Sequence, residues 1–366
     1  MTARTAPHTV RRARNLSRGR GPLALAAALA ATLLLGGCVA GEDAAAGSPA
    51  DDAGSTGTAD ASWSADTLTL DYATYNPLSL VIRDQGWLED TLGDDVTVEW
   101  VQSAGSNKAN EALRAGAIDV GSTAGSAALL ARSNGSPIRT IDIYSQPEWA
   151  ALVVPAGSDI TDVADLAGRS VAATKGTDPY FFLLQALDAA GVDPADVEVQ
   201  NLQHADGKAA LENGSVDAWA GLDPLMAASQ ADAGSTLLYR NVDFNTYGLL
   251  NATQDFLDAS PDLAQVVVDA YEKARAWALE NPEQVATILA DVAGIDPAVA
   301  TTVISERTTL DIDPVPAGAQ RDVLAVVGPF FVESGDVASQ DLVDAALDEL
   351  FDPTFAEQAD PSTIAD

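Results

Sequence analysis

Three pairs of residues that could cap helices and bind a small ligand stand where predicted strands give way to predicted helices. They are Asn76-Pro77, Asp178-Pro179 and Asp223-Pro224. Asn or Asp accepts hydrogen bonds from first-turn amides, and proline fits the first helical position because no N–H is needed there. Each pair therefore predicts a helix that begins at its proline. Capping without any ligand contact explains a single pair equally well.

Together, these helix starts could form a site for a small anion. The carboxyl ends of parallel strands and the starts of the following helices meet at one edge of an α/β sheet. Free amides and the positive end of the helix dipole favour an anion there. Two further strand ends, Ser103-Ala104-Gly105 and Gly121-Ser122-Thr123, would add hydroxyls and amides. Because small hydroxyl residues are more often simple turn formers, both interpretations stay open.

The segments that must position these residues alternate from Thr67 onward between short β-branched runs and longer amphipathic ones. This alternation is typical of an α/β fold with mainly parallel sheets. It breaks at two neighbouring strands, 138–144 and 149–155, and becomes purely helical after residue 253, with helices near 261–281, 283–293, 297–306 and 318–333. Two α/β lobes, 67–148 plus 247–366 and 149–246, account for this order. We expect a ligand cleft between them.

The first 37 residues have the composition of an export signal. Six arginines and no acid precede an apolar run over 22–35, which is too short to cross a bilayer core about 30 Å thick. The following Leu35-Gly36-Gly37-Cys38 resembles the bacterial lipobox. We expect a lipoprotein signal peptide over 1–37, a lipid on Cys38 that anchors the chain to the outer face of the cell membrane, and a flexible tether over 38–66.

Composition and charge exclude several classes of function. Cys38 is the only cysteine, so after lipidation no thiol remains for a disulfide, a zinc site or a nucleophile. Removal of residues 1–37 leaves 13 basic against 54 acidic residues, a formal charge of −41. Nucleic acid is therefore excluded as a partner, because phosphate binding needs a basic face. The acid excess indicates a solubility device.

The sequence implies no metal, no cofactor and no catalytic group. The acid-rich segments 309–314 and 344–352 lack the glycine and the alternating acids of a calcium loop. His204 falls at a predicted helix start, where a capping or surface role is expected. No spacing singles out a pair of carboxylates for acid–base chemistry. We therefore expect a binding protein and not an enzyme.

Four segments, taken in order, resemble the substrate-binding proteins of ABC importers for aliphatic sulfonates, taurine and nitrate. They are EALRAGAIDVGST (111–123), DLAGRSVAATKGT (165–177), LLQALDAAGV (183–192) and VDAWAGLDP (216–224). The resemblance covers roughly residues 67–350. It implies a type II periplasmic-binding-protein fold that closes on a small ligand and delivers it to an ABC permease in the membrane. We expect the receptor to be a monomer.

Carried over position by position, the resemblance implies a ligand site built from several loops. Its residues are Tyr75, Asn76, Ser103, Gly105, Ser122, Thr123, Glu148, Trp149, Thr177, Asp178, Tyr180, Trp219 and Asp223. Where sulfonate binders tend to have Ser or Thr after Lys-Gly, this chain continues from Thr177 into Asp178 and Pro179. The change adds a carboxylate and removes an amide donor, which weakens the case for an anion there.

This departure leaves two interpretations of the ligand open. In one, Asp178 caps its helix while Thr177, the hydroxyls of 122–123 and nearby amides hold an anionic end, with Lys175 adding charge. In the other, Asp178, Asp223 or Glu148 faces a cationic end, as in an amino-sulfonate. We expect an aliphatic sulfonate or a related organosulfur compound. The alternatives are a taurine-like zwitterion, nitrate or a thiamine precursor.

Two other classes of protein share the implied fold. Aromatic sulfinate desulfinases and fungal thiamine-pyrimidine synthases are enzymes that this fold resembles. The first rely on a cysteine nucleophile, and the second on an active-site histidine and a cysteine-rich motif that this sequence lacks. A surface adhesion or sensor protein of the same fold is a further alternative, and sequence alone does not distinguish it from an importer subunit.

Overall fold

The computed structural model describes residues 63–366, so the predicted signal peptide, Cys38 and most of the predicted tether lie outside the described residues. The last four residues of that tether lie against the folded part. The amide of Ser64 donates to Asp262 Oδ2 (2.9 Å), and the carbonyl of Asp66 accepts from Thr97 N (2.9 Å). The folded part therefore begins no later than Trp63, which packs against the hydrophobic core.

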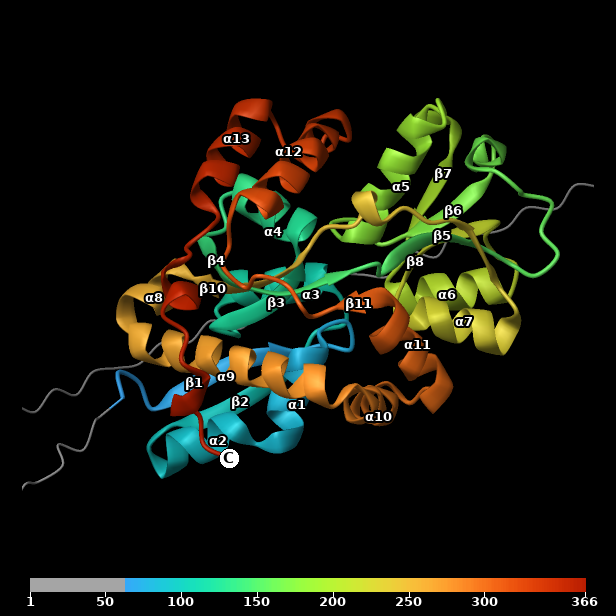
Figure 1. Cartoon of the computed structure of the whole chain (residues 1–366). Coiled ribbons are helices and arrows are strands. Elements are labelled where there is room, and N and C mark those ends of the chain that lie inside the picture. Colours follow the sequence, from blue (N-terminus) through green and yellow to red (C-terminus); the bar gives the residue numbers. More distant parts are fainter. Residues whose placement is uncertain (1–62) are drawn as a thin grey trace, which may run out of the picture. The chain divides into compact units, whose positions relative to one another are not determined.

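Two β-sheets organise the described residues (Figure 1). The first sheet has the strand order β11-β4-β10-β3-β1-β2 and the second β7-β6-β8-β5-β9. The first sheet contains β1 (Thr67–Tyr72), β2 (Thr97–Gln102), β3 (Val120–Ala124), β4 (Ile138–Pro147), β10 (Gly248–Thr253) and β11 (Thr308–Thr309). The second contains β5 (Ala150–Val154), β6 (Ser170–Ala173), β7 (Glu198–Asn201), β8 (Ala218–Leu222) and β9 (Thr236–Tyr239).

Strand direction agrees only in part with the predicted parallel sheets. β1 pairs in parallel with β2 and β3, and β6 with β7 and β8. β10 runs antiparallel to β3 and β4, and β5 runs antiparallel to β8 and β9. The antiparallel strands are those next to the two places where the chain passes from one sheet to the other. We call these places, residues 148–149 and 240–247, the connecting segments.

Helices cover both sheets. Those between β1 and β10 are α1 (Pro77–Gln85), α2 (Trp87–Leu92), α3 (Ser106–Ala115), α4 (Gly125–Ser133), α5 (Asp178–Ala189), α6 (His204–Glu212) and α7 (Leu225–Ala233). The remainder are α8 (Gln254–Ala259), α9 (Pro261–Glu280), α10 (Pro282–Ala293), α11 (Pro297–Arg307), α12 (Gly318–Glu333), α13 (Gln340–Glu349) and α14 (Thr354–Glu357). The four helices predicted after residue 253 are confirmed as α9 to α12.

Proline and glycine explain several of these boundaries. Pro261, Pro282 and Pro297 each stand at the start of a helix, where the missing N–H costs nothing. The helix predicted to begin at Pro77 is α1, and α2 follows it after a single residue. Gly86 adopts a left-handed conformation (φ 69°) and ends α1, and α2 begins at the next residue.

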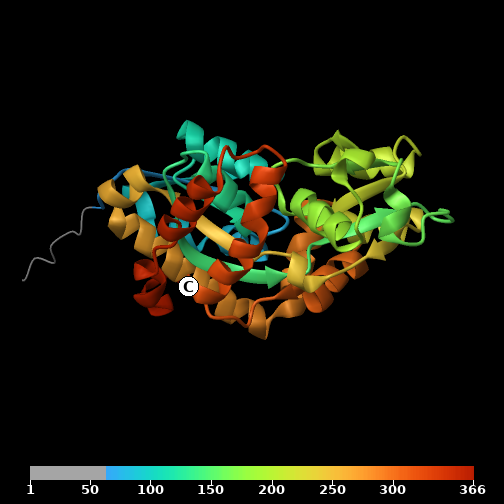
Figure 2. The same ribbon diagram turned by 90° about the horizontal axis from the view of Figure 1, so that it is seen from above.

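The C-terminal helices pack on elements of both sheets. α12 and α13 pack on α4, which follows β3 of the first sheet, while α12 also contacts α5 and α11 contacts α7. Figure 2 shows the red C-terminal helices beside the blue and teal elements of the first sheet. The rings of Phe181 in α5 and Phe331 in α12 lie 4.6 Å apart between centroids. Phe181 and Phe182 both belong to the core, since they are 1% and 0% exposed.

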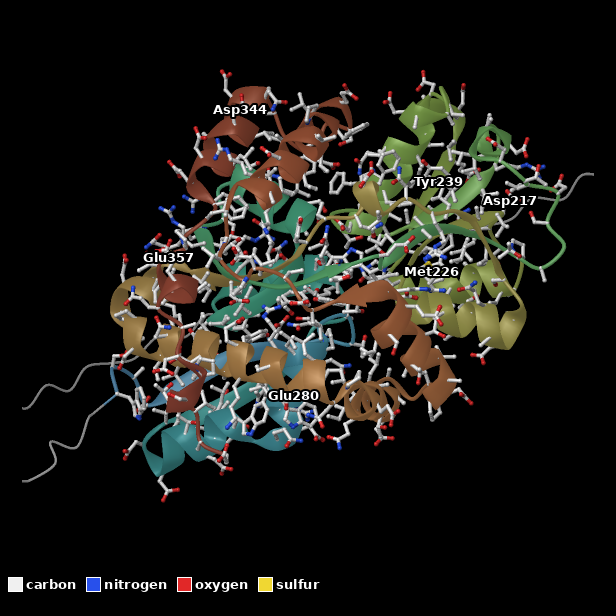
Figure 3. All side chains as sticks on the ribbon, in the orientation of Figure 1. Asp217, Met226, Tyr239, Glu280, Asp344 and Glu357 are labelled. Atoms are coloured by element: carbon white, nitrogen blue, oxygen red, sulfur yellow. The ribbon has the colours of Figure 1, made fainter. Side chains whose placement is uncertain are left out.

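The acidic surface is spread over many elements. The exposed carboxylates of Asp344, Glu357 and Glu280 lie on α13, α14 and the end of α9, and Figure 3 shows them well apart. Such a distribution fits a solubility role better than a binding site. Within residues 63–366, none of the helices combines the length and apolar character that crossing a membrane requires.

Candidate functional site

Helix starts from both sheets meet around two small cavities. The first, the His204 cavity, is lined by Tyr75, Ser106, Ala124, Trp149, Thr177, Asp178, Pro179, His204 and Leu222. The second, the Arg307 cavity, is lined by Thr74, Tyr75, Pro77, Pro147, Trp149, Asp223, Val303, Ile304, Arg307 and Thr308. The first residues of α1, α3, α5 and α6 are among them. The expectation that the three proline-containing joints lie at one place is therefore met.

An aromatic pair separates the two cavities. Tyr75, before α1, and Trp149, in the first connecting segment, line both cavities. Their rings meet edge to face, with centroids 6.1 Å apart and an interplanar angle of 84°. In each cavity, the volume that the centre of a water molecule can occupy is about 10 Å³. This is near the minimum volume that holds one water. The structure is therefore closed around a space too small for an organic solute.

The carboxylate of Asp178 is held by donors from three other parts of the chain. Its Oδ1 accepts from Ser126 Oγ (2.5 Å) and Thr246 Oγ1 (2.7 Å). Its Oδ2 accepts from Trp149 Nε1 and Thr246 N, both at 2.8 Å. Asp178 is 2% exposed, and burial raises the pKa of its carboxyl while these four donors oppose the rise. The donors are of the kind that binds an external oxyanion.

The three proline pairs cap their helices differently from one another. Asn76 caps α1 as predicted, since its Oδ1 accepts from Ser79 N at 3.3 Å. Asp178 is not a cap: Thr177 is the N-cap residue of α5, and the Asp178 side chain binds the four tertiary donors instead. Asp223 accepts from Ala227 N (2.9 Å). Its bond to Pro224 is cis and α7 begins one residue later than predicted.

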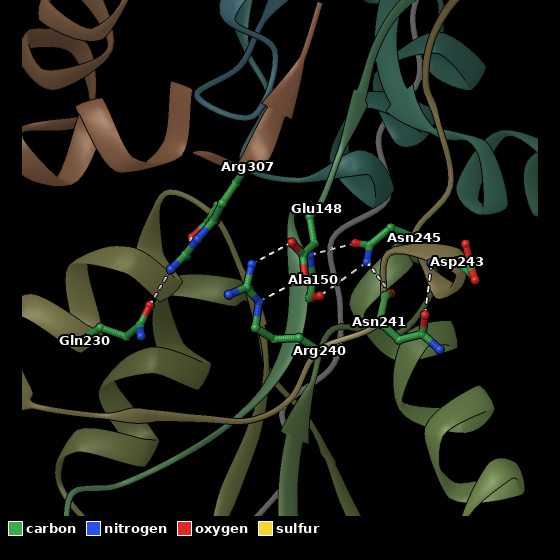
Figure 4. A network of polar contacts seen from close by, with 9 residues as sticks. Glu148, Ala150, Gln230, Arg240, Asn241, Asp243, Asn245 and Arg307 are labelled. Atoms are coloured by element: carbon green, nitrogen blue, oxygen red, sulfur yellow. Dashed lines mark hydrogen bonds and ion pairs between the residues drawn. The ribbon is translucent and has the colours of Figure 1, made fainter. Parts of the chain in front are cut away.

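A buried ion pair joins α11 to the second sheet beside the Arg307 cavity. Arg307 Nη1 donates to both carboxylate oxygens of Asp223, at 3.0 and 3.1 Å. Its Nη2 donates to Gln230 Oε1 at 2.6 Å (Figure 4). Arg307 is 8% and Asp223 3% exposed. Burial raises the pKa of the Asp223 carboxyl, and the charge of Arg307 opposes that rise. Asp223 directly follows β8 of the second sheet and Arg307 directly precedes β11 of the first, so the pair links segments of the two sheets.

The connecting segments carry a second ion pair, which is more exposed. Arg240 donates to both oxygens of Glu148, at 2.9 and 2.6 Å (Figure 4). Beside it, Asn245 Oδ1 accepts from Ala150 N (2.8 Å) and Asn245 Nδ2 donates to Asn241 O (3.0 Å). These bonds tie the two connecting segments together. Glu148 is thus engaged by Arg240 and lines neither cavity.

The structure brings together five of the thirteen residues implied by the resemblance. Those that line the cavities are Tyr75, Trp149, Thr177, Asp178 and Asp223. Those that do not are Asn76, Ser103, Gly105, Ser122, Thr123, Glu148, Tyr180 and Trp219. Of the second group, Gly105 lies against the ring of His204, and Asn76 Nδ2 donates to Tyr271 Oη at 2.9 Å.

The other residues of that second group are engaged elsewhere. Ser103 N donates to Tyr72 O (3.0 Å), and Thr123 Oγ1 accepts from Asn251 Nδ2 (2.8 Å). Trp219 is fully buried against Gly207 of α6, where an added Cβ would lie 2.7 Å from the indole nitrogen. Tyr180 lines a larger hollow of about 760 Å³ between α5 and α12. That hollow gathers no helix starts from the first sheet, so we place the candidate site at the two cavities.

Sequence reasoning missed several cavity residues, above all His204 and Arg307. His204 is 1% exposed, which makes the predicted surface role wrong, and burial lowers the pKa of its imidazole to about 4. Arg307 is the last residue of α11 and pairs with Asp223, 84 positions away. No local pattern marks either residue. The strand end at Ser103-Ala104-Gly105 is the one local signal near these residues, and α3 begins directly after it, at Ser106.

A buried carboxylate beneath the site makes stability depend on pH. Asp71 is 1% exposed, and its Oδ1 accepts from Ser122 N (2.8 Å) and Oγ (3.0 Å). Burial raises the pKa of Asp71 from 3.8 to about 7. A carboxyl whose pKa is higher in the folded state stabilises the fold at low pH, and this contribution is lost as pH rises through about 7. Wild-type stability should therefore fall between pH 5 and pH 8.

The substitution Asp71→Asn should reduce this fall. One pKa unit corresponds to about 1.4 kcal/mol, so we expect the variant to exceed wild type at pH 8 by at least about 1 kcal/mol. Urea unfolding of both proteins at pH 5 and pH 8 measures the effect. Asp344→Asn, on the exposed face of α13, is the matched control and should leave the pH difference unchanged. If the free energy of unfolding falls by the same amount between pH 5 and pH 8 in wild type and Asp71→Asn, Asp71 is not the group responsible for the fall.

Known proteins were compared with this chain. The family model described as NMT1/THI5 like matches residues 79–285. A protein named as an aliphatic sulfonates-binding protein from Escherichia coli (strain K12) is 31% identical over 222 residues, which are 60% of this chain and 70% of that protein.

Two solved structures are also similar. The alkanesulfonate-binding protein SsuA from Xanthomonas axonopodis pv. citri, bound to MOPS, has a TM-score of 0.69 and 24% identity, with coverage of 77% of this chain and 98% of that one. The periplasmic aliphatic sulphonate binding protein SsuA from Escherichia coli has a TM-score of 0.67 and 27% identity, with coverage of 79% and 93%.

Proposed function

We propose that this chain, which belongs to the NMT1/THI5-like family, is the solute-binding lipoprotein of an ABC importer and that its solute is an aliphatic sulfonate or a related organosulfur compound. The family and the periplasmic-binding-protein fold are those predicted from the sequence, and the similar proteins confirm both. Those relatives are named as binding proteins, which favours a binding role over an enzyme.

The observation that carries the proposal is the set of four donors that converge on Asp178. Ser126, in α4, Trp149 and Thr246 present two hydroxyls, an indole N–H and a backbone amide to one carboxylate. A sulfonate also presents several oxygens that accept hydrogen bonds, and charge-assisted bonds of this type are strong. We propose that the sulfonate takes these donors in place of the carboxylate of Asp178.

Exchange of the two anions requires the lobes to separate. The two cavities have room for about one water each, so a solute enters only after the parts on either side move apart, as in hinge closure. We take the lobes to be 67–148 plus 247–366 and 149–246, with hinges at the connecting segments. Opening would move Ser126 in one lobe away from Asp178 in the other, and rotation at the connecting segments, which contain Trp149 and Thr246, would free the other donors.

The place of action follows from the proposed lipid. Acylated Cys38 would hold the chain at the outer face of the cell membrane, and the segment after it would let the folded part reach a permease. The receptor would act there as a monomer and hand its solute to the permease. The acidic surface seen on several helices keeps such a receptor soluble.

A thermal-shift screen of the mature chain, residue 38 onward, tests the proposed solute. The panel comprises alkanesulfonates, taurine, aryl sulfonates, sulfinates, nitrate and thiamine precursors. A solute at about 100 times its Kd should stabilise the fold by about 2.7 kcal/mol, which raises Tm by several degrees. A response to another class, with none to any sulfur oxyanion, would defeat the sulfonate assignment and leave the receptor role in place.

A further inference from the structure

The imidazole of His204 forms part of the wall of the His204 cavity. The residue begins α6, is 1% exposed and lines the cavity together with Trp149 and Asp178. Its ring packs against Gly105, where an added Cβ would lie 3.0 Å from His204 Cδ2 and 3.1 Å from Nε2. The ring is therefore fixed in place with one edge at the cavity.

The hydrogen bonds around the ring determine which nitrogen carries the proton. The single hydroxyl hydrogen of Thr174 is donated to the carbonyl of Leu202 (2.7 Å). Its oxygen, 3.2 Å from His204 Nδ1, must then accept from that nitrogen. Burial lowers the pKa of the ring to about 4, so it is neutral at pH 7. Nε2 is consequently a bare acceptor.

This acceptor has no hydrogen-bond partner although it is buried. Among the residues that line the two cavities, His204 is the one whose side chain has a buried polar atom without a partner. Buried polar groups in folded proteins are normally satisfied, and an exception calls for a ligand, a water or a functional reason. His204 lines the cavity next to Asp178, on which the proposed sulfonate donors of Trp149 and Thr246 converge.

We propose that His204 Nε2 recognises the solute by accepting a hydrogen bond from an ammonium or hydroxyl group at the end opposite the sulfonate. The inference rests on the proposed function, because the solute is taken to be a sulfonate. It narrows the solute to amino- or hydroxyalkanesulfonates and makes His204 a specificity-determining residue. A donor on the solute would pair with Nε2, whereas a methyl group at the same position would leave the acceptor unpaired.

Three probes with the same number of non-hydrogen atoms isolate this contact. They are 2-aminoethanesulfonate, 2-hydroxyethanesulfonate and propane-1-sulfonate, and their affinities for the mature chain are measured by isothermal titration calorimetry. We expect at least one donor-bearing probe to bind at least about tenfold more tightly than propane-1-sulfonate, because a site built for a hydrogen bond rejects the analogue that lacks it. In His204→Phe, the three affinities should become equal within about twofold.

A second variant separates recognition from folding. His204→Gln keeps an acceptor oxygen and should retain part of the preference, whereas a purely structural role would lower all three affinities together and leave their ratio unchanged. Equal affinities in wild type, an unchanged ratio in His204→Phe, or no binding of any donor-bearing compound would overturn the inference. A different result would separate the two proposals: compounds of another class that carry a donor bind in place of sulfonates, more tightly than their matched methyl analogues, and His204→Phe abolishes this preference. The sulfonate assignment would then fail, and the role of His204 would stand.

Discussion

The substitution Arg307→Ala is expected to lower the free energy of unfolding by about 3–5 kcal/mol, which is the usual cost of removing one partner from a buried ion pair. Asp223 would then have only the amide of Ala227 as a donor to its carboxylate, in a site that is 3% exposed. Because the pair joins α11 to the second sheet, its loss also favours an open cleft. Urea unfolding at pH 7 measures the change in stability.

The ion pair between Arg240 and Glu148 of the connecting segments provides a matched control. Arg240→Ala breaks the contact with Glu148, but the Arg240 side chain is 48% exposed, so we expect a loss of at most about 1 kcal/mol. The double variant Arg307→Ala/Asp223→Asn should regain part of the stability, since it removes the unpaired charge. If Arg307→Ala costs no more than Arg240→Ala, the pair does not hold the cleft closed.

The substitution Asp178→Ser is expected to increase the affinity for a sulfonate by about 10- to 100-fold. The wild-type carboxylate competes with the sulfonate for the four donors. A hydrogen bond to a charged group contributes about 1.5–3 kcal/mol, and each 1.4 kcal/mol changes the affinity by about a factor of ten. The solute-free variant should be less stable by about 3 kcal/mol, because donors such as Ser126 Oγ and Thr246 N lose their acceptor.

Calorimetric titration of both proteins with one alkanesulfonate measures the affinities, and thermal unfolding with added sulfate provides a second readout. Sulfate should raise the Tm of Asp178→Ser more than that of wild type, since it can fill the vacated donors. Asp178→Asn, which keeps the shape of the side chain without its charge, should fall between the two. A collapse of affinity in Asp178→Ser would show that the carboxylate grips a cationic part of the solute, as the second interpretation of the sequence holds. Unchanged affinity would mean that these donors do not hold the sulfonate.

Local sequence was sufficient for much of the fold. The helix starts predicted at Pro77 and near residues 261 and 297 are confirmed, and a proline stands at each of them, because the conformational preference of proline acts within one turn. The order of β-branched and amphipathic runs indicated the α/β class, and four short segments indicated the family. Each of these properties depends on neighbours in the chain or on motif order, which the sequence displays directly.

Tertiary structure alone decided the chemistry of the site. A local rule makes Asp178 a helix cap, yet Ser126 and Thr246, which are 52 and 68 positions away, provide stronger partners. His204 has the local pattern of an exposed helix start, and only the packing of Gly105 against it turns the ring into a buried cavity wall. The physical reason is that burial and long-range donors determine the state of a polar group, and both arise only when distant segments meet.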